Sequence, residues 1–319
     1  MPATPDLTTR AGLGRAITLI ESTRTDHQAE ARRLLAAATP LAGKAQRIGV
    51  TGVPGVGKST FIDAFGTMLT GMGHKVAVLA VDPSSKRSHG SILGDKTRMA
   101  RLSMDANAFI RPSPAGDTLG GVGRRTRETM LLCEAGGYDV ILVETVGVGQ
   151  SETVVADMVD FFLVLMLPNA GDELQGIKKG VLETADLIAV NKADIDEQAA
   201  RRAARHYETA LHILGPSDPD WSPPVQRISG QTGQGLEDLW ITIQSHRKKT
   251  EASGGRARRR AGQQVRWLEA LIVEGLSDAF AADPEIAARL RQTRDEVAQG
   301  VLPASTAAED LLAQFFGHT

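Results

Sequence analysis

The sequence predicts an α/β fold in which helices cover both faces of a mostly parallel central sheet. Between residues 46 and 250, short apolar runs alternate with stretches that are long enough to form a helix. Helical crossovers join parallel strands, so this alternation favours a parallel sheet over a series of hairpins. The expected strands are Arg47–Thr51, Val76–Val81, Phe109–Arg111, Val140–Glu144, Phe161–Leu167, Leu187–Asn191 and Val225–Ser229, and a helix is expected over Ile92–Met104.

A helical extension is expected on each side of the domain formed by residues 46–250. Residues 1–45 are predicted to be helical, because Leu13, Ile17 and Ile20 recur at helical spacing. Residues 251–319 are predicted to begin with a basic, solvated linker over Glu251–Gly262 and to continue as a helical arm; contact of the basic run with an anionic partner is the alternative for the linker. The helices of this arm are expected over Val265–Phe280, Pro284–Ala298 and Ala308–Phe316.

The C-terminal arm is too small to build a core of its own. We therefore expect it to pack on a second copy of the chain and to make the protein a homodimer. Packing on its own chain is the alternative.

Composition limits the classes of partner. The chain has 319 residues, of which 42% are hydrophobic, so it has enough apolar material for a sizeable core. Its 36 basic and 38 acidic side chains give a net charge of −2, which gives no electrostatic reason to expect nucleic acid as a partner. Cys133 is the only cysteine. The sequence shows neither a targeting signal nor an apolar run long enough to span a bilayer, so we expect a cytoplasmic protein without membrane contact.

A phosphate-binding motif follows the first expected strand. Residues 52–59 read Gly-Val-Pro-Gly-Val-Gly-Lys-Ser and match G-x-x-x-x-G-K-[ST] at every fixed position, between a strand and a helix. In such a P-loop, backbone amides surround the phosphates, the lysine reaches the β- and γ-phosphates and the serine binds Mg²⁺. A glycine-rich turn with a chance Lys-Ser is the alternative. The residues expected to form the cradle are Pro54, Gly55, Val56, Gly57, Lys58, Ser59 and Thr60.

A second motif predicts that the base is guanine. The strand Leu187–Asn191 ends in Asn-Lys-Ala-Asp, and the Asp194 carboxylate can accept hydrogen bonds from both the ring N–H and the amino group of guanine. Adenine lacks this pair of donors, and an unpaired acceptor is costly. Asn191 is expected to brace the neighbouring loops, and the stem of Lys192 to cover one face of the base. The next strand leads into Ser229, Gly230 and Gln231, which are expected to close over the base; an ordinary strand-to-helix turn is the alternative.

Two expected strands end in acidic residues near the presumed γ-phosphate. Asp82 follows one and Glu144 ends another, so both are expected to hold Mg²⁺ directly or through water, with capping of a turn as the alternative. Lys58 and Glu144 are therefore candidate catalytic residues. Val148 stands where common regulatory GTPases have a glutamine, which predicts slow intrinsic turnover that a partner accelerates.

Two candidate mobile loops accompany these acids. Residues 84–98 contain Asp95, and residues 168–179 contain Lys178. Lys178 is a candidate cation that moves in to stabilise transferred charge, although a solvated surface lysine is the alternative.

These motifs together resemble those of one family, the MeaB/ArgK group of SIMIBI-class P-loop GTPases, which are chaperones of methylmalonyl-CoA mutase. A glutamate at the start of the motif that begins at Glu144 is typical of this group. The segments that carry the resemblance are Gly52–Thr60, Val81–Ser85, Ser91–Arg98, Glu144–Ser151 and Asn191–Asp194.

The resemblance implies more than the residues alone. Members of the group are homodimers that bind the cobalamin-dependent mutase. They use GTP to gate delivery of adenosylcobalamin from its adenosyltransferase and to protect or rescue the mutase. It also implies that Ser59, Asp82, Asp95 and Glu144 surround Mg²⁺, and that residues 168–179 form a third switch that responds to the partner.

Three other functions are less consistent with the sequence. Nickel-insertion GTPases share this fold but usually carry cysteine or histidine metal motifs, whereas here Cys133 is alone and the seven histidines are scattered. A P-loop kinase is disfavoured because Asn-Lys-x-Asp selects against ATP. A non-catalytic nucleotide-binding adaptor is disfavoured because Lys58, Ser59, Asp82 and Glu144 are all present.

Overall fold

The computed structural model describes residues 5–81, 99–112, 119–145, 151–168, 179–215 and 218–317. The chain divides into two compact units, Met1–Gln263 and Gln264–Thr319. Within the described residues, no helix has both the length and the apolar character that a membrane crossing requires.

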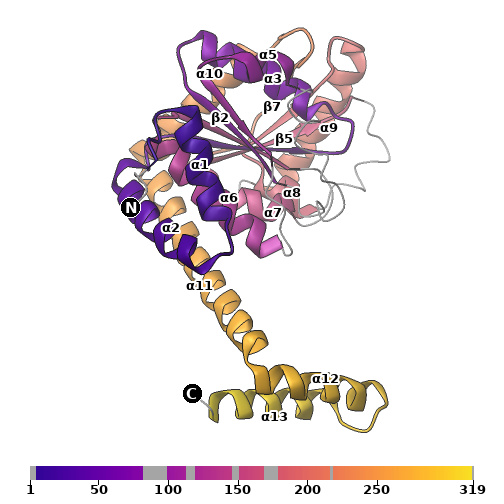
Figure 1. The fold of residues 1–319 in the computed structure, drawn as a ribbon. Coiled ribbons are helices and arrows are strands. Elements are labelled where there is room, and N and C mark those ends of the chain that lie inside the picture. Colours follow the sequence, from indigo (N-terminus) through magenta and orange to yellow (C-terminus); the bar gives the residue numbers. More distant parts are fainter. Residues whose placement is uncertain are drawn as a thin grey trace. The chain divides into compact units, whose positions relative to one another are not determined.

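The first unit is built on a parallel sheet of seven strands in the order β3-β2-β4-β1-β5-β6-β7 (Figure 1). All six pairings between neighbouring strands are parallel, which confirms the predicted fold class. The strands are β1 (Gln46–Gly52), β2 (Val76–Val81), β3 (Ala108–Arg111), β4 (Val140–Thr145), β5 (Phe161–Met166), β6 (Leu187–Val190) and β7 (Val225–Arg227). Every predicted strand is present, and β7 is shorter than predicted because it ends before Ile228.

Among the described residues, three helices cover one face of the sheet. They are α3 (Lys58–Gly71), α5 (Ala100–Met104) and α10 (Leu236–Ala252). Phe61 and Phe65 of α3 are stacked 5.2 Å apart and are buried together with Trp240 of α10 against β1, β4 and β5. Of the helix predicted over Ile92–Met104, α5 is the part that lies within the described residues.

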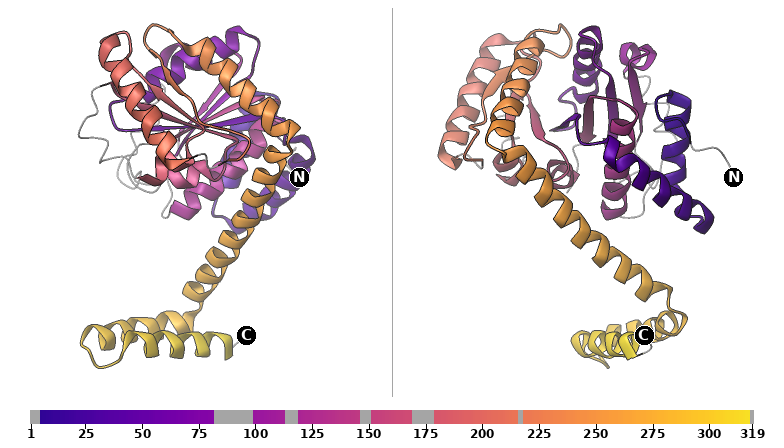
Figure 2. Two further views of the ribbon diagram at one scale, coloured as in Figure 1. Left: turned by 180° about the vertical axis from the view of Figure 1, so that it is seen from behind. Right: turned by 90° about the vertical axis from the view of Figure 1, so that its left-hand side faces the viewer.

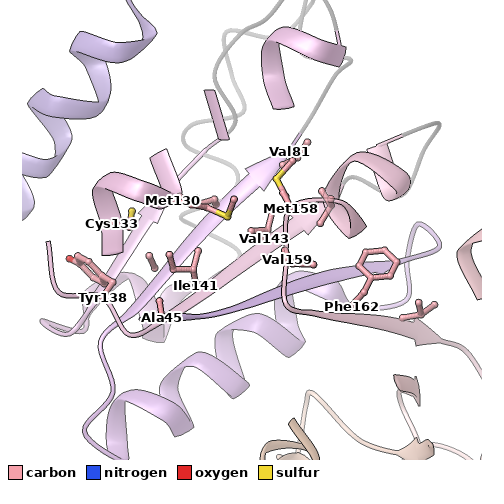
Figure 3. Close-up of a cluster of buried hydrophobic side chains, with 14 of the residues drawn as sticks. Ala45, Val81, Met130, Cys133, Tyr138, Ile141, Val143, Met158, Val159 and Phe162 are labelled. Carbon is pink, nitrogen blue, oxygen red and sulfur yellow. The ribbon is translucent and has the colours of Figure 1, made fainter. Parts of the chain in front are cut away.

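The opposite face is covered by α6 (Leu119–Ala135), α7 (Ser151–Ala156), α8 (Lys179–Thr184) and α9 (Glu197–Leu214). Figure 3 shows part of this cluster, in which Ile141 and Val143 of β4 lie on the same side as Met130 and Cys133 of α6. Burial raises the pKa of the Cys133 thiol far above its usual value, and the nearby Glu134 charge acts in the same direction. Cys133 is therefore an apolar packing residue.

Two helices form the N-terminal extension, as predicted. They are α1 (Arg10–Glu21) and α2 (Thr25–Ala38), with a short 3₁₀ turn, η1 (Thr39–Leu41), after them. Both pack on α6, so the extension adds to this side of the sheet (Figure 1). Arg10 donates to the Ala108 carbonyl and Glu21 pairs with Arg111, and these contacts fix the extension to edge strand β3.

The prediction of a solvated linker over Glu251–Gly262 is wrong. The helix α10 ends at Ala252, and the next helix, α11 (Gly255–Ala282), already begins at Gly255. The arginine run therefore forms the first turns of a helix, for which arginine has a good intrinsic propensity. Its charges are neutralised by distant carboxylates, which composition alone does not reveal.

These carboxylates are Asp160 and Asp186, which directly precede β5 and β6 and are 2% and 3% exposed. Arg260 binds Asp160 through Nε at 2.6 Å and through Nη2 at 2.7 Å. Arg259 binds Asp186 with two hydrogen bonds of 3.0 and 3.1 Å. The root of α11, residues 255–263, is thus held to the amino edge of the sheet by charge-assisted hydrogen bonds, which are stronger than neutral ones.

The second unit is entirely helical. It holds the remainder of α11, together with α12 (Pro284–Ala298) and α13 (Ala304–Gly317), and the rear and side views in Figure 2 show these last two helices lying side by side. Ile286 of α12 and Leu311 of α13 are buried, and Phe280 meets Phe315 edge to face. All three helices predicted for the arm are therefore present.

Asp160 makes the stability of the first unit sensitive to acid. Burial alone would raise the pKa of its carboxyl, but hydrogen bonds from Arg260 and the charges of Arg260 and Arg256 outweigh burial and lower the pKa to about 2. A depressed pKa contributes stability that is present above the unfolded value near 4 and is lost as pH falls toward 2, which is worth about 2–3 kcal/mol. We expect Asp160→Asn to destabilise the chain by about 3–5 kcal/mol at pH 7 and by less at pH 2–3, as measured by urea unfolding.

The matched control is Arg201→Met, which breaks an exposed ion pair with Glu197 and should cost less than about 1 kcal/mol at either pH. A loss for Asp160→Asn that is the same at pH 7 and pH 2.5 would contradict the assigned role of the carboxylate.

Candidate functional site

The candidate site lies at the carboxyl edge of the sheet, around the end of β1. The chain adds β2, β3 and β4 on one side of β1 and then β5, β6 and β7 on the other. Ligands of open parallel sheets bind at the carboxyl ends of the strands where the direction of winding reverses in this way. The loops after β1, β6 and β7 therefore lie at the edge where the two motifs predicted a nucleotide, and β4 ends beside β1 at the same edge.

The residues of the phosphate motif form a loop that ends in α3. Gly57 precedes the helix with φ of 93°, a left-handed conformation that favours glycine, and a Cβ there would lie 3.0 Å from the side chain of Asn191. The first-turn amides of α3 have no acceptor within the helix and point out of its N-terminus. Pro54, Gly55 and Thr60 are exposed, whereas Val56 is buried and fixes the loop to the core below.

Lys58 is buried beneath this loop. Its ammonium group donates to the carbonyl oxygens of Gly52 at 2.8 Å and Val53 at 3.3 Å. Burial lowers the pKa of Lys58, while the charges of Glu144 and Glu152 act in the opposite direction. The loop thus holds a desolvated cation whose partners are neutral carbonyl groups, an environment that favours binding of an anion.

Ser59 and Glu144 meet across the gap between α3 and β4. The Ser59 hydroxyl donates to Oε1 of Glu144 at 3.2 Å, and Glu144 is only 9% exposed. A hydroxyl and a carboxylate are both hard oxygen donors of the kind that Mg²⁺ binds. This pair, predicted from two motifs 85 positions apart, is brought together by the parallel pairing of Val50 with Glu144.

Asn191 joins the phosphate loop to the loop that follows β7. Its side-chain amide donates to the Val56 carbonyl at 2.8 Å, and its side-chain oxygen accepts from the Gly230 amide at 2.9 Å. The bracing role expected for this residue is therefore visible as two buried hydrogen bonds. Lys192, which has φ of 60°, donates from its ammonium group to the Gly55 carbonyl at 2.8 Å, so its side chain extends along the phosphate loop.

The other residues expected to contact the base divide into buried and exposed groups. Ser229 is fully buried, and its hydroxyl accepts from the Thr232 amide at 3.0 Å, so this side chain shapes its own loop. Gly230 packs so closely on α3 that a Cβ would lie 2.9 Å from Cα of Phe61. Asp194 and Gln231 are exposed, which leaves the Asp194 carboxylate accessible to a base.

Several predicted positions lie outside the described residues. They are Asp82, Asp95, Val148, Lys178 and most of the loop over residues 168–179. The structure therefore brings together the phosphate loop, Glu144 and the guanine motif, and leaves the remaining predicted metal ligands and the catalytic Lys178 as expectations. Among the described residues, no group of three or more His, Cys, Asp and Glu side chains could hold a metal ion.

Sequence reasoning missed two features of this edge. Glu152, in the first turn of α7, lies close enough to Lys58 for its charge to act on the Lys58 pKa. Thr51 and Thr145 form a buried hydroxyl pair between β1 and β4. The only signal for the pair was a threonine at the end of each of two apolar strands, and strand position alone explains threonine just as well.

Comparison with known proteins agrees with this geometry. Residues 13–285 match the family described as methylmalonyl Co-A mutase-associated GTPase MeaB. The chain belongs to this family. Its fold and motifs are therefore those of a GTPase that binds GTP and GDP.

Individual relatives match along most of their length. A protein of Caulobacter vibrioides is 62% identical over 306 residues, covering 96% of this chain and 94% of its own. GTPase ArgK of Escherichia coli is 48% identical over 303 residues, covering 95% and 92%. A crystal structure described as a LAO/AO transport system kinase is 41% identical, with a TM-score of 0.77 and coverage of 98% of this chain and 95% of that one.

The double contact of Asn191 predicts that Asn191→Ala weakens GTP and GDP binding alike. The substitution removes two buried hydrogen bonds and leaves the Gly230 amide and the Val56 carbonyl unpaired, at about 1–3 kcal/mol for each group. Two such groups together cost about 2 kcal/mol or more, so we expect a loss of affinity of about thirtyfold or more, measured with a fluorescent nucleotide by titration.

A contrasting variant is Asp194→Asn, which retains the loops but changes the group that faces the base. It should reduce affinity for guanine nucleotides without an equal loss for xanthine nucleotides. An Asn191→Ala variant that binds both nucleotides at the normal affinity would show that the two bonds do not shape the site.

Proposed function

We propose that the protein is a GTP-dependent chaperone of methylmalonyl-CoA mutase, which couples GTP binding and hydrolysis to delivery of adenosylcobalamin and to protection and reactivation of the mutase. The observation that supports nucleotide binding is the position of Asn191, whose side chain holds the phosphate loop to the loop that follows β7. The mutase part is supported by the match to a family described as mutase-associated.

In this proposal the cradle holds the phosphates as the P-loop motif requires. The amides of Gly55, Gly57 and the first turn of α3 bind phosphate oxygens, as do the hydroxyl and backbone of Thr60. Lys58 exchanges its bonds to the Gly52 and Val53 carbonyls for bonds to phosphate oxygens, which better neutralise a buried cation. Asp194 reads guanine, with Lys192, Ser229, Gly230 and Gln231 completing the base site.

Mg²⁺ fits the oxygen donors at this edge. Ser59 and Glu144 would hold it, directly or through water, with Asp82 and Asp95 as the further ligands that the family resemblance implies. The ion supplies neutralisation of the charge that develops on the phosphates. Glu144 also lies close enough to Lys58 to support the protonated form of that lysine, so the two groups act together on the γ-phosphate.

Intrinsic hydrolysis is proposed to be slow. Val148 cannot orient a water as a glutamine does, and Lys178 is proposed to act only once the partner has positioned it. The partner would then accelerate hydrolysis by completing the site. In this arrangement the GTP-bound state persists until the mutase accelerates hydrolysis.

The mutase assignment predicts nucleotide-dependent association. We expect purified methylmalonyl-CoA mutase to bind the full chain loaded with GDP or with a non-hydrolysable GTP analogue, with different affinities in the two states. We also expect the mutase to raise GTP turnover from an intrinsic rate below about one per second. Biolayer interferometry and a phosphate-release assay measure the two effects.

Asn191→Ala serves as the control, because weak nucleotide binding should abolish the difference between the two states. Absence of association in both states would overturn the chaperone proposal while leaving the GTPase assignment intact. An unstimulated rate of tens per second would overturn the proposal of slow intrinsic hydrolysis.

A homodimer formed through the C-terminal arm is the second part of the proposal. Large apolar side chains lie exposed at positions i, i+3, i+7 and i+11 of α11, where they share one helical face. They are Val265, Leu268, Ile272 and Leu276, and they are between 52% and 58% exposed. A continuous apolar stripe of this kind on a helix marks an association surface, and a second copy provides a complementary one.

Charged substitutions on this stripe should separate the protomers. We expect Leu268→Asp combined with Ile272→Asp to convert the dimer to a monomer, as measured by light scattering after size-exclusion chromatography, because each aspartate would be desolvated in the interface. Ala270→Asp, on the same helix but off the stripe, should leave the dimer intact. A wild-type chain that elutes as a monomer at micromolar concentration would contradict the dimer.

A further inference from the structure

A pair of buried hydroxyl groups lies between the carboxyl ends of β1 and β4, next to the phosphate loop. Thr51 is the penultimate residue of β1 and Thr145 is the last residue of β4, and their Oγ1 atoms are 2.7 Å apart. Both side chains are almost fully buried, at 1% and 0% exposure. Because side chains alternate along a strand, the pair lies on the face of the sheet opposite to the Glu144 carboxylate.

The surroundings of the pair are apolar. Val81 lies beside Thr145 on β2, and Val164 lies beside Thr51 on β5, and both belong to the cluster on this face. Valine has nearly the same shape as threonine and would pack here without burying a hydroxyl, which costs free energy unless it is hydrogen-bonded. Packing alone therefore does not account for two hydroxyls at this place, whereas their mutual bond does.

The positions of the two threonines connect them to the candidate chemistry. Thr51 directly precedes Gly52, whose carbonyl accepts from Lys58. Thr145 directly follows Glu144, whose carboxylate accepts from Ser59. The bond between the two hydroxyl groups thus links the strand end that leads into the phosphate loop to the strand end that carries Glu144. Each threonine is one residue away from the group that it positions.

We propose that Thr51 and Thr145 are positioning residues for GTP hydrolysis, which hold the end of β4 against the end of β1 and so fix Glu144 relative to the phosphate loop. This inference rests on the proposed role of Glu144 at the metal ion. Neither threonine touches the nucleotide. Without the bond, the end of β4 would shift and carry Glu144 away from the position in which it helps to hold the γ-phosphate and its metal ion. GDP, which is held mainly by the phosphate loop and the guanine motif Asn191–Asp194, is expected to bind with the same affinity as in the unmodified chain.

The test uses the full-length chain and single-turnover GTP hydrolysis, with GDP affinity measured in parallel. We expect Thr51→Val and Thr145→Val each to lower the hydrolysis rate about tenfold, which is less than the hundredfold that a 1 Å misplacement can cause. GDP affinity should change by less than about twofold. The double variant should be no slower than either single variant, because all three remove the same bond.

Conservative variants distinguish the hydroxyl from the shape. Thr51→Ser and Thr145→Ser retain the hydrogen bond and should retain the rate to within about twofold, even where their loss of a methyl group lowers the thermal midpoint. Thr250→Val is the matched control. It removes a buried hydroxyl of α10, bonded to the His246 carbonyl at 2.9 Å, and should affect stability without affecting hydrolysis.

Three results would overturn the inference. They are a normal rate in both valine variants, single effects that multiply in the double variant, and a serine variant as slow as its valine counterpart. Glu144→Gln tests the underlying assignment separately. If that variant retains normal hydrolysis and Mg²⁺ dependence while the valine variants are slow, the metal role of Glu144 fails and the coupling of the two strand ends stands.

Discussion

The parallel pairing of β1 with β4 and β5 determines how the phosphate loop and Glu144 lie relative to each other. Val50 pairs with Glu144 on one side, and Gly52 pairs with Leu165 on the other. A shift of β1 by one residue would turn its buried side chains to the opposite face and would break the apolar clusters on both faces. Packing of the core therefore fixes the register, and the register brings the phosphate loop to the acid that faces it.

The two edges of the sheet have different kinds of polar contact. At the amino edge, Asp160 and Asp186 are enclosed by arginines from the root of α11, and these charges are already paired within the chain. At the carboxyl edge, the Lys58 ammonium group donates to the neutral carbonyl oxygens of Gly52 and Val53, and the Ser59 hydroxyl donates to Glu144 at 3.2 Å. Paired charges favour one fixed arrangement, whereas the Lys58 ammonium group can exchange its neutral carbonyl partners for a phosphate. The amino edge of the sheet thus contributes to stability, whereas the carboxyl edge can bind a ligand.

Sequence reasoning was most successful where a motif is short and lies directly after a strand. The phosphate loop and Asn191–Asp194 needed only local spacing, and the alternation of apolar runs was enough to predict the parallel sheet. The arginine run was misread because its partners lie about 70 to 100 positions away, and a basic segment with no visible counter-charge resembles a solvated linker. For Asn191, the sequence predicts that it braces the neighbouring loops but not which two atoms it binds, because these are set by the packing of Gly230 on α3. Side-chain pairs such as Thr51 with Thr145 depend on register to a single residue, which apolar periodicity does not give.

The state of Lys58 links this geometry to the action of a nucleotide. In the free chain, burial disfavours the charged ammonium group and lowers its pKa, and the negative charges of Glu144 and Glu152 offset only part of that effect. A phosphate placed on the loop supplies the missing negative charge and raises the pKa toward its ordinary value. The complex therefore binds this proton more tightly than the free chain does, so nucleotide affinity decreases as pH rises through the pKa of Lys58 in the free chain. Glu144 both supports the lysine charge and accepts a hydrogen bond from Ser59, so any movement of the end of β4 would alter the surroundings of both side chains. The contact between the ends of β1 and β4 thus sets the surroundings of both Lys58 and Ser59.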